Sequence, residues 1–161
     1  MPKHFIEPIK IENARILFRN FSGRETEYNR AGNRNFHVII DDENVALKLK
    51  EEGWNIKVRQ TSDDDEPMYH MQIAVRFDNV PPNVYLVTSK NKTRLDEESI
   101  NQLDNADITN VDLEIRPYQW EVNKKTGIKA YLKTMYVTIE EDAFAEKYAQ
   151  EEFPQDDNPP W

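Results

Sequence analysis

The sequence lacks cysteine entirely, holds only 4 glycines in 161 residues, and has no long apolar run. Without cysteine there is no disulfide framework, no thiolate nucleophile and no cysteine-based zinc site. The glycines lie far apart, so the glycine-rich loops that cradle nucleotide phosphates are missing. No segment approaches the roughly 18 apolar residues that span a bilayer, and the N-terminus has no secretory apolar region. We therefore expect a soluble, cytoplasmic chain with one folded domain.

The net charge of -9 is distributed unevenly along the chain. Residues 140–161 hold eight acidic side chains and a single base, Lys147, and the run Asp63-Asp64-Asp65-Glu66 adds four acids in a polar stretch. The remainder of the chain has a small excess of basic residues. We interpret the acidic segments as a solvated tail and a solvated loop. The acidic total therefore does not exclude a nucleic acid as the partner of the remaining chain.

Alternating and apolar runs predict about seven strands and two or three short helices. The helices are expected after Asp42, over 97–103 behind a capping Asp96, and near Phe144 and Tyr148. Strands that do not alternate regularly with helices are typical of a small antiparallel β-barrel. We expect this domain at residues 1–149 and a disordered acidic tail at 150–161. The predicted strands are residues 9–21, 35–40, 54–60, 69–77, 84–88, 111–120 and 128–139.

The last two of these strands form a predicted hairpin with aromatic and cationic side chains on one face. A four-residue turn at 123–126 would pair position 116 with 133, 118 with 131 and 120 with 129. A slip of one residue would scatter the cluster over both faces. The six residues are Arg116, Tyr118 and Trp120 on the first strand, and Lys129, Tyr131 and Lys133 on the second.

The same mixture of aromatic and basic residues recurs elsewhere. Single-stranded nucleic acid is bound by this combination because cations neutralise phosphates and flat side chains stack on unpaired bases. The alternative interpretation is an ordinary sheet surface, on which strand aromatics pack beside solubilising lysines. The further candidates for nucleic-acid binding are Arg15, Arg19, Phe21, Arg24, Tyr28, Arg30 and Arg34, then Trp54, Lys57 and Arg59, and the loop residues Lys90, Lys92 and Arg94.

The chain ends in DDNPPW, which resembles the acidic tail tip of bacterial and phage single-stranded-DNA-binding proteins. Those tips end in phenylalanine, whereas this one ends in tryptophan. The resemblance implies that the tip recruits replication or recombination proteins. The ring of Trp161 would fill an apolar pocket, Asp156 and Asp157 would meet basic residues, and Pro159 and Pro160 would limit the flexibility of the tip.

The body of the chain strengthens this resemblance. The runs ILFRNFSGRETEYNRAGNRNFHVII and ITNVDLEIRPYQWEVNKKTGIKAYLKTMYVTI are similar to phage-encoded single-stranded-DNA-binding proteins of the oligonucleotide/oligosaccharide-binding (OB) fold. The similarity covers about residues 9–139 and implies a five-stranded barrel whose open face binds a strand without reading its sequence. It further implies protection of single-stranded DNA during phage replication or recombination, with DNA preferred over RNA.

Two other classes of function compete with this one. A metal-dependent nuclease would need grouped ligands, but His4, His37 and His70 are dispersed and each is more typical of a structural histidine. The run 63–66 offers carboxylates to a magnesium ion, yet adjacent acids in a loop mostly face solvent. An acidic DNA mimic that inhibits a host defence nuclease would spread its acids over a folded surface, whereas here they are concentrated. We therefore expect a non-catalytic binder without a cofactor or metal, and leave a homo-oligomer open.

Overall fold

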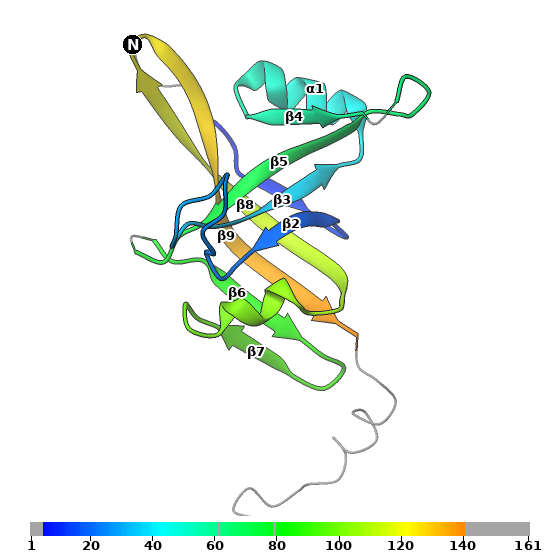
Figure 1. Ribbon diagram of the computed structural model, residues 1–161, viewed down its shortest axis with the longest axis vertical. Coiled ribbons are helices and arrows are strands. Elements are labelled where there is room, and N and C mark those ends of the chain that lie inside the picture. The colour runs from blue at the N-terminus through cyan, green and yellow to red at the C-terminus, as the bar shows by residue number, and fades with distance from the viewer. Residues whose placement is uncertain (1–4, 61, 79, 141–161) are drawn as a thin grey trace, which may run out of the picture.

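The computed structural model describes residues 5–60, 62–78 and 80–140 of the chain (Figure 1). Their main elements are strands, which confirms the mainly β class. The predicted helix near Phe144 and the acidic tail at 150–161 lie outside the described residues. In chain order the elements are β1 (Ile9–Ile11), β2 (Ile16–Asn20), β3 (Arg34–Ile40), α1 (Glu43–Glu52), β4 (Ile56–Arg59), β5 (Met68–Val75), β6 (Asn83–Val87), β7 (Lys92–Leu95), the 3-10 helix η1 (Ile100–Asp104), β8 (Ile108–Val122) and β9 (Lys125–Ile139).

All the described strands belong to one sheet, whose main path runs β1-β8-β9-β5-β3-β2. Strand β4 pairs with β5, and the β6–β7 hairpin joins the sheet along β9. The sheet is mixed rather than antiparallel throughout, because β9 runs parallel to both β5 and β6. It is also not closed by a ladder between β1 and β2, although the Ala14 N–H donates to the Val111 carbonyl at 2.7 Å. The expectation of an antiparallel barrel is corrected in these two respects.

The long strand predicted at 9–21 is two strands, β1 and β2, which pair with different neighbours. The chain breaks at Asn13, whose φ of 54° is a left-handed conformation that asparagine tolerates better than most residues. Its N–H donates to Oδ1 of Asp112 on β8 at 2.9 Å. The alternation changes phase at this break, because the apolar side chains are Ile9 and Ile11 before it and Ala14 and Ile16 after it. The prediction of a single strand overlooked this change.

The β8–β9 hairpin turns at Asn123 and Lys124, both with positive φ, so its loop has two residues rather than the four predicted. The register therefore differs from the prediction by two: Trp120 faces Gly127, and position 118 faces 129. A two-residue shift preserves the face of each side chain, because side chains alternate with period two along a strand. The predicted shared face thus survives a wrong register.

The helix α1 begins and ends where the sequence predicts. The Asp42 carboxylate accepts the N–H groups of Asn44 and Val45, and Gly53 with φ 120° ends the helix. The predicted helix at 97–103 is the shorter η1, and the predicted loop at 89–94 contains β7. Among the described residues, no helix has the length and apolar composition of a membrane span.

One hydrophobic core lies under the curved sheet and collects side chains from β3, β5, β6, β8, β9 and η1. Phe21 and Phe36 stack at its centre with ring centroids 5.1 Å apart, and both are fully buried. The outward sides of β5 and β9 are left free of this core, and they carry the candidate site.

Candidate nucleic-acid interface

The outward face of the β8–β9 hairpin carries the aromatic and cationic residues that the sequence places there. Tyr118 is 54% exposed and Trp120 is 37% exposed. The ring of Tyr131 lies 6.1 Å from that of Tyr118, in an edge-to-face arrangement. The Arg116 guanidinium and the Lys129 ammonium lie 5.5 Å and 5.3 Å from the Tyr131 ring centroid. The predicted cluster therefore exists, with cations held against an aromatic surface.

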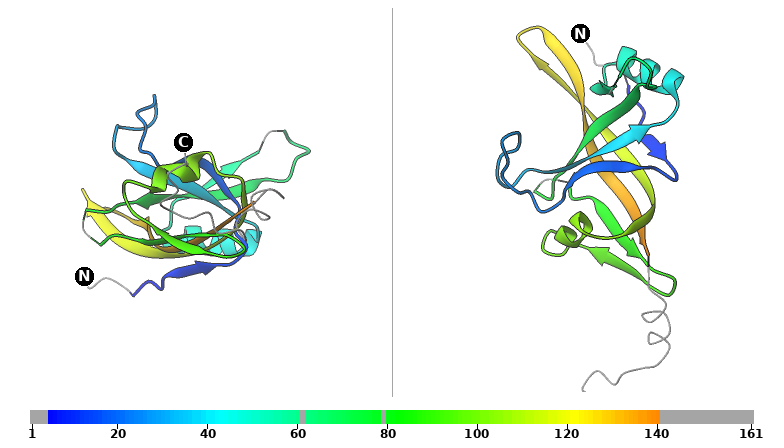
Figure 2. Two further views of the ribbon diagram at one scale, coloured as in Figure 1. Left: turned by 90° about the horizontal axis from the view of Figure 1, so that it is seen from below. Right: turned by 45° about the vertical axis from the view of Figure 1, so that its right-hand side comes forward.

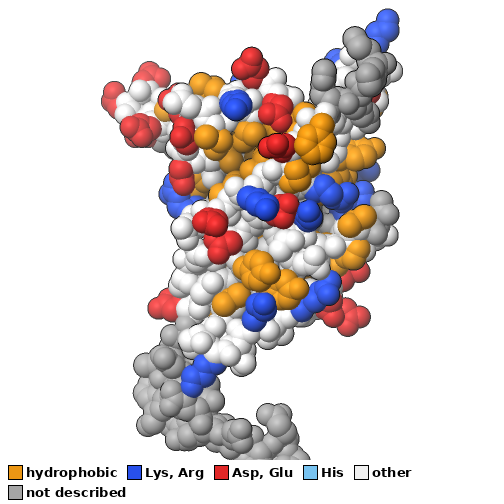
Figure 3. All heavy atoms as spheres, turned by 180° about the vertical axis from the view of Figure 1, so that it is seen from behind, with side chains coloured by type: hydrophobic (Ala, Val, Ile, Leu, Met, Phe, Trp, Pro, Cys, Tyr) orange, Lys and Arg blue, Asp and Glu red, His pale blue; other side chains and the backbone are white. Residues whose placement is uncertain are grey.

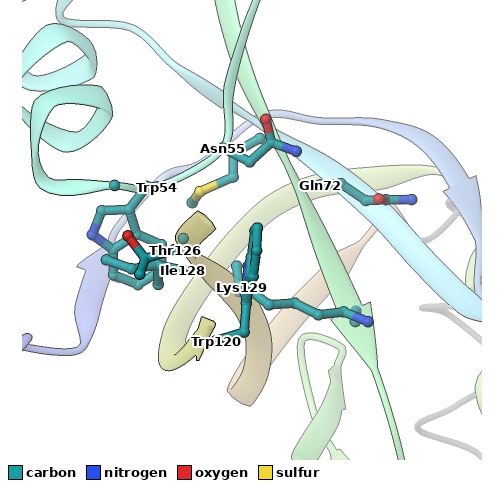
Figure 4. Close-up of a pocket in the computed structure, with 12 residues that line it drawn as sticks. Trp54, Asn55, Gln72, Trp120, Thr126, Ile128 and Lys129 are labelled. Carbon is teal, nitrogen blue, oxygen red and sulfur yellow. The ribbon is translucent and has the colours of Figure 1, made fainter. Parts of the chain in front are cut away.

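Trp120 borders a hollow of about 470 Å³ between the hairpin and β5. Figure 4 shows its indole beside the Lys129 side chain, with Gln72 of β5 and Asn55 on the opposite side of the hollow. The indole lies over Gly127, where an added Cβ would come within 2.5 Å of the ring. Glycine at this position therefore makes room for the tryptophan.

Two more hollows continue this one along β5, with volumes of about 420 and 440 Å³. The first and second share Gln72, Ala74 and Lys129, and the second and third share Arg76 and Asp78. We call this continuous surface the β5–β9 groove. Its aromatic and cationic lining consists of Arg34, Trp54, Arg76, Phe77, Arg116, Tyr118, Trp120, Lys129 and Tyr131, of which Trp54 is almost fully buried.

The cations of the groove differ in whether an acid neutralises them. Nε of Arg76 donates to Oδ1 of Asp78 at 3.1 Å, and this bond holds the pKa of the carboxyl below its usual range. Arg34 pairs with Glu97 at 3.3 Å. Within the described part of the chain, Arg116 and Lys129 form no ion pair. The sequence did not predict Arg76 as a site residue. It lines the groove because the fold places it beside Tyr131, which is distant in the chain.

A second feature of the outward face is a pair of histidines covered by Phe18. Nδ1 of His37 lies 2.9 Å from Nδ1 of His70, and the Phe18 ring packs edge-on to both. Burial, then His70 and then Lys57 lower the pKa of His37 to about 4, and burial also lowers the pKa of His70. These histidines are far apart in the sequence and were predicted to be dispersed, whereas the pairing of β3 with β5 places them side by side. Within the described residues, no group of three potential metal ligands includes them.

The predicted residues Lys57 and Arg59 lie on β4 next to this pair. Lys57 pairs in register with His70, and the Arg59 guanidinium lies 5.8 Å from the centroid of the Phe18 ring. Both cations are exposed. They extend the basic surface beyond the groove.

Two aromatic predictions are wrong because the side chains are buried. Phe21 is fully buried against Phe36, and Trp54 is 2% exposed beneath the hairpin, where it bridges to Ile128. Neither ring has a free face for a base. Arg19 also has a structural role, since it donates to the backbone carbonyls of Leu103 and Ala106 at 2.8 Å each and ties β2 to the end of η1.

The remaining arginines of this segment lie at the surface. Arg15 pairs with Asp41, and Arg24 lies 4.0 Å from Asp104. Arg30 and the 92%-exposed Tyr28 belong to the loop between β2 and β3. Figure 2, right, shows this loop and the β8–β9 hairpin projecting from the same side of the molecule.

The last group of predicted residues lies on or near β9 and β7. Lys133 pairs with Glu114 of β8 at 3.3 Å. Lys90 and Lys92 are exposed, and Arg94 donates to Oδ1 of Asn83 at 2.9 Å. The predicted tail residues 156–161 lie outside the described part of the chain.

Comparison with solved structures identifies the fold. The single-stranded DNA-binding protein from bacteriophage Enc34, in a C-terminal truncation, matches with a TM-score of 0.54 and 15% identity over 84% of this chain and 87% of that chain. The same bacteriophage Enc34 protein in complex with ssDNA matches with a TM-score of 0.51 and 16% identity over 84% of this chain and 88% of that chain. The architecture is therefore OB-like, as the sequence resemblance implies. A search of curated proteins gave no match.

The sequence itself carries the family assignment. The family model of the phage ssDNA-binding domain matches residues 2–158. The match includes both strands of the hairpin, the β5 strand and the segments between them. Because it extends over nearly the whole sequence, this chain belongs to the phage ssDNA-binding domain family.

Proposed function

We propose that this chain binds single-stranded DNA without sequence preference, and that the strand lies in the β5–β9 groove. The observation that carries the proposal is the continuity of three hollows whose lining combines exposed aromatic rings with cations. Trp120 and Tyr118 offer ring surface for stacking on bases, while Arg116 and Lys129 are available to phosphates. Stacking is tolerant of sequence because every base has a π-face.

The loop between β2 and β3 and the cations of β4 extend the proposed interface. Tyr28 and Arg30 project from the loop, and Lys57 and Arg59 lie on the outward side of β4. Family membership and the Enc34 complex with ssDNA support single-stranded DNA as the ligand. We assign the binding domain to residues 1–149 and expect no catalytic step and no cofactor.

Fluorescence titration with oligo-dT tests the proposal. Trp120 is the exposed tryptophan of the groove and Trp54 is buried, so stacking should quench emission chiefly through Trp120. Affinity should fall as salt rises, because phosphate contacts release counterions. The matched control is the Trp120→Phe variant, which should bind with a smaller quench. An absence of binding at low salt would reject the proposal, as would an affinity that salt leaves unchanged.

We further propose that the protein protects single-stranded DNA during phage replication or recombination. The acidic residues 150–161 would recruit partner proteins through Asp156, Asp157, Pro159, Pro160 and Trp161. The tail's resemblance to the tips of related proteins supports this role. A chain shortened to residues 1–150 should keep its affinity for oligo-dT or gain slightly, because a competing polyanion is removed. A large loss of affinity would contradict a purely recruiting tail.

A further inference from the structure

The outward side of β9 carries a second aromatic and basic cluster beyond the groove. The rings of Tyr85 and Tyr136 stack with centroids 4.9 Å apart and an interplanar angle of 15°. Nζ of Lys92 lies 5.2 Å from the Tyr85 centroid and 5.6 Å from the Tyr136 centroid. Tyr136 remains 37% exposed. We call these three residues the Tyr85–Tyr136 platform.

A β-bulge explains why this platform faces the same way as the groove. Leu132 pairs with position 115 and Thr134 with position 114, which leaves Lys133 as an extra residue on β9. Strict alternation would place Tyr131 and Tyr136 on opposite sides, but the bulge returns them to one side. Leu132 and Met135 accordingly point together into the core. At about 3.3 Å per residue the two tyrosines lie on the order of 16 Å apart along the strand.

The path beside Tyr136 carries charges of both signs. Glu12, Asp112 and Glu114 line a hollow together with Tyr136 and Lys10, and Lys92 and Lys133 supply further cations. Lys133 lies between the two tyrosines, and its pairing with Glu114 leaves its side chain 50% exposed. Lys92 forms no ion pair with any described residue, and the neighbouring Lys90 is exposed. The acid opposite Tyr136 is Asp112, which accepts hydrogen bonds from the N–H of Asn13 and from Asn110.

The space-filling view agrees with this description. Figure 3 shows hydrophobic and basic side chains adjoining one another across the rear face of the molecule. Acidic side chains are present in this view too, at the top and margins and also in the middle of the face, among the basic side chains and above the lower hydrophobic cluster. Aromatic surface and positive charge therefore occur together outside the groove as well as in it.

We infer that the Tyr85–Tyr136 platform is a second contact for the same DNA strand that occupies the groove. Nucleotides beyond those in the groove follow β9 past Lys133, a base stacks on the tyrosine pair, and Lys92 meets a phosphate. The inference rests on the proposed function, and single-stranded DNA is the occupant because the path continues the groove with the same residue chemistry. It predicts a binding site longer than the groove alone.

Oligo-dT of increasing length separates the two contacts. The double variant Tyr85→Leu with Tyr136→Leu keeps apolar bulk on the sheet but removes the flat rings. We expect unchanged affinity for oligonucleotides that fill only the groove, and about a tenfold loss for longer ones, as expected for one lost base stack. Lys92→Gln should lower the salt dependence for long oligonucleotides alone, by roughly 0.7 in the log–log slope. Its matched control, Lys48→Gln on α1, should change neither length class.

The results also separate failure of this inference from failure of the proposed function. A wild-type chain that binds no oligonucleotide rejects the proposed function. The second contact alone is overturned if the wild-type chain binds and the double variant has the same affinity at all lengths. It is also overturned if the double variant loses the same affinity at all lengths. Should the double variant unfold in a thermal melt, wild-type protein crosslinked to oligonucleotides containing 5-iododeoxyuridine gives the answer. Crosslinks at Tyr85 or Tyr136 with long oligonucleotides support the contact, and crosslinks confined to groove residues overturn it.

Discussion

The hairpin 111–139 and the segment 15–34 have similar numbers of aromatic and basic residues, yet the two regions have different roles in the fold. In the hairpin, the Arg116 and Lys129 side chains lie against an aromatic ring and face the groove. In the segment, the Arg19 guanidinium donates hydrogen bonds to backbone carbonyls, and the Phe21 ring is buried in the core. The difference comes from the surroundings. Among the residues that the structure describes, no other element covers the outward hairpin face, whereas η1 and β3 pack against the segment and supply acceptors and apolar surface. A local density of aromatic and basic residues therefore indicates an interface only where the fold leaves it uncovered.

The largest expected effect is a loss of stability in the segment 15–34. Phe21→Ala removes a fully buried ring that stacks on Phe36 and should cost about 3–5 kcal/mol of unfolding free energy. Urea denaturation followed by circular dichroism measures this loss. The folded fraction should bind oligo-dT normally. A stable variant with weakened binding would instead place Phe21 in the interface.

The hairpin should show the opposite behaviour. Trp120→Ala removes an exposed ring and should weaken oligo-dT binding by roughly 1–3 kcal/mol, with little change in stability. Fluorescence anisotropy of a labelled oligonucleotide measures the affinity without depending on tryptophan emission. Tyr131→Ala should act in the same direction. If either variant merely melts at a lower temperature and binds normally, the hairpin face is structural and the contrast with the segment disappears.

The one exposed phenylalanine of the segment gives a pH-dependent prediction. Phe18 covers the histidine pair, and the pKa of His37 is lowered to about 4, from an ordinary value of 6.5, mainly by burial. In the unfolded chain His37 takes up a proton near pH 6.5, whereas in the folded chain it does so only near pH 4. The free energy of unfolding should therefore fall as the pH drops across this interval. Because the His37 imidazole is only partly buried, we expect the free energy of unfolding to fall by about 1–2 kcal/mol between roughly pH 7 and pH 5.

Urea unfolding at the two pH values measures this loss. His37→Gln, which cannot take up the proton, should show a smaller fall than the wild type. An equal fall in both proteins would assign the pH dependence to other groups, either His70, whose pKa is also lowered by burial, or the carboxylates. NMR titration of the imidazole protons provides an independent reading of the His37 pKa.

The smallest effect compares one arginine from each region. Arg116 faces the groove without an ion pair among the described residues, whereas Arg15 is paired with Asp41. Arg116→Gln should reduce the slope of log affinity against log salt by about 0.7, the value for one phosphate contact with a single strand. Arg15→Gln should leave the slope unchanged. Equal slopes for the two variants would show that ion pairing does not distinguish the regions.

Particular residues show why the site was only partly predictable. Side chains alternate in a strand, so the common face of Arg116, Tyr118 and Trp120 follows from the sequence even with the turn wrongly placed. The bulge at Lys133 is not visible in the alternation, and for this reason Tyr136 escaped the prediction. Arg76 escaped it as well, because its role depends on the approach of β5 to β9.

The sequence by itself determined the strands of the hairpin, the caps of α1, the mainly β class and the sharing of one face by aromatic and basic residues. These depend on local chemistry: alternation, capping side chains and turn residues. Only the tertiary structure decided that Phe21 and Trp54 are buried, that His37 touches His70, and that a groove exists. Each of these outcomes depends on strands distant in the chain being placed side by side. The antiparallel pairing of β3 with β5 brings the histidines together, and the parallel pairing of β9 with β5 forms the groove. Burial and long-range pairing are properties of the packed sheet as a whole, and no local sequence pattern records them.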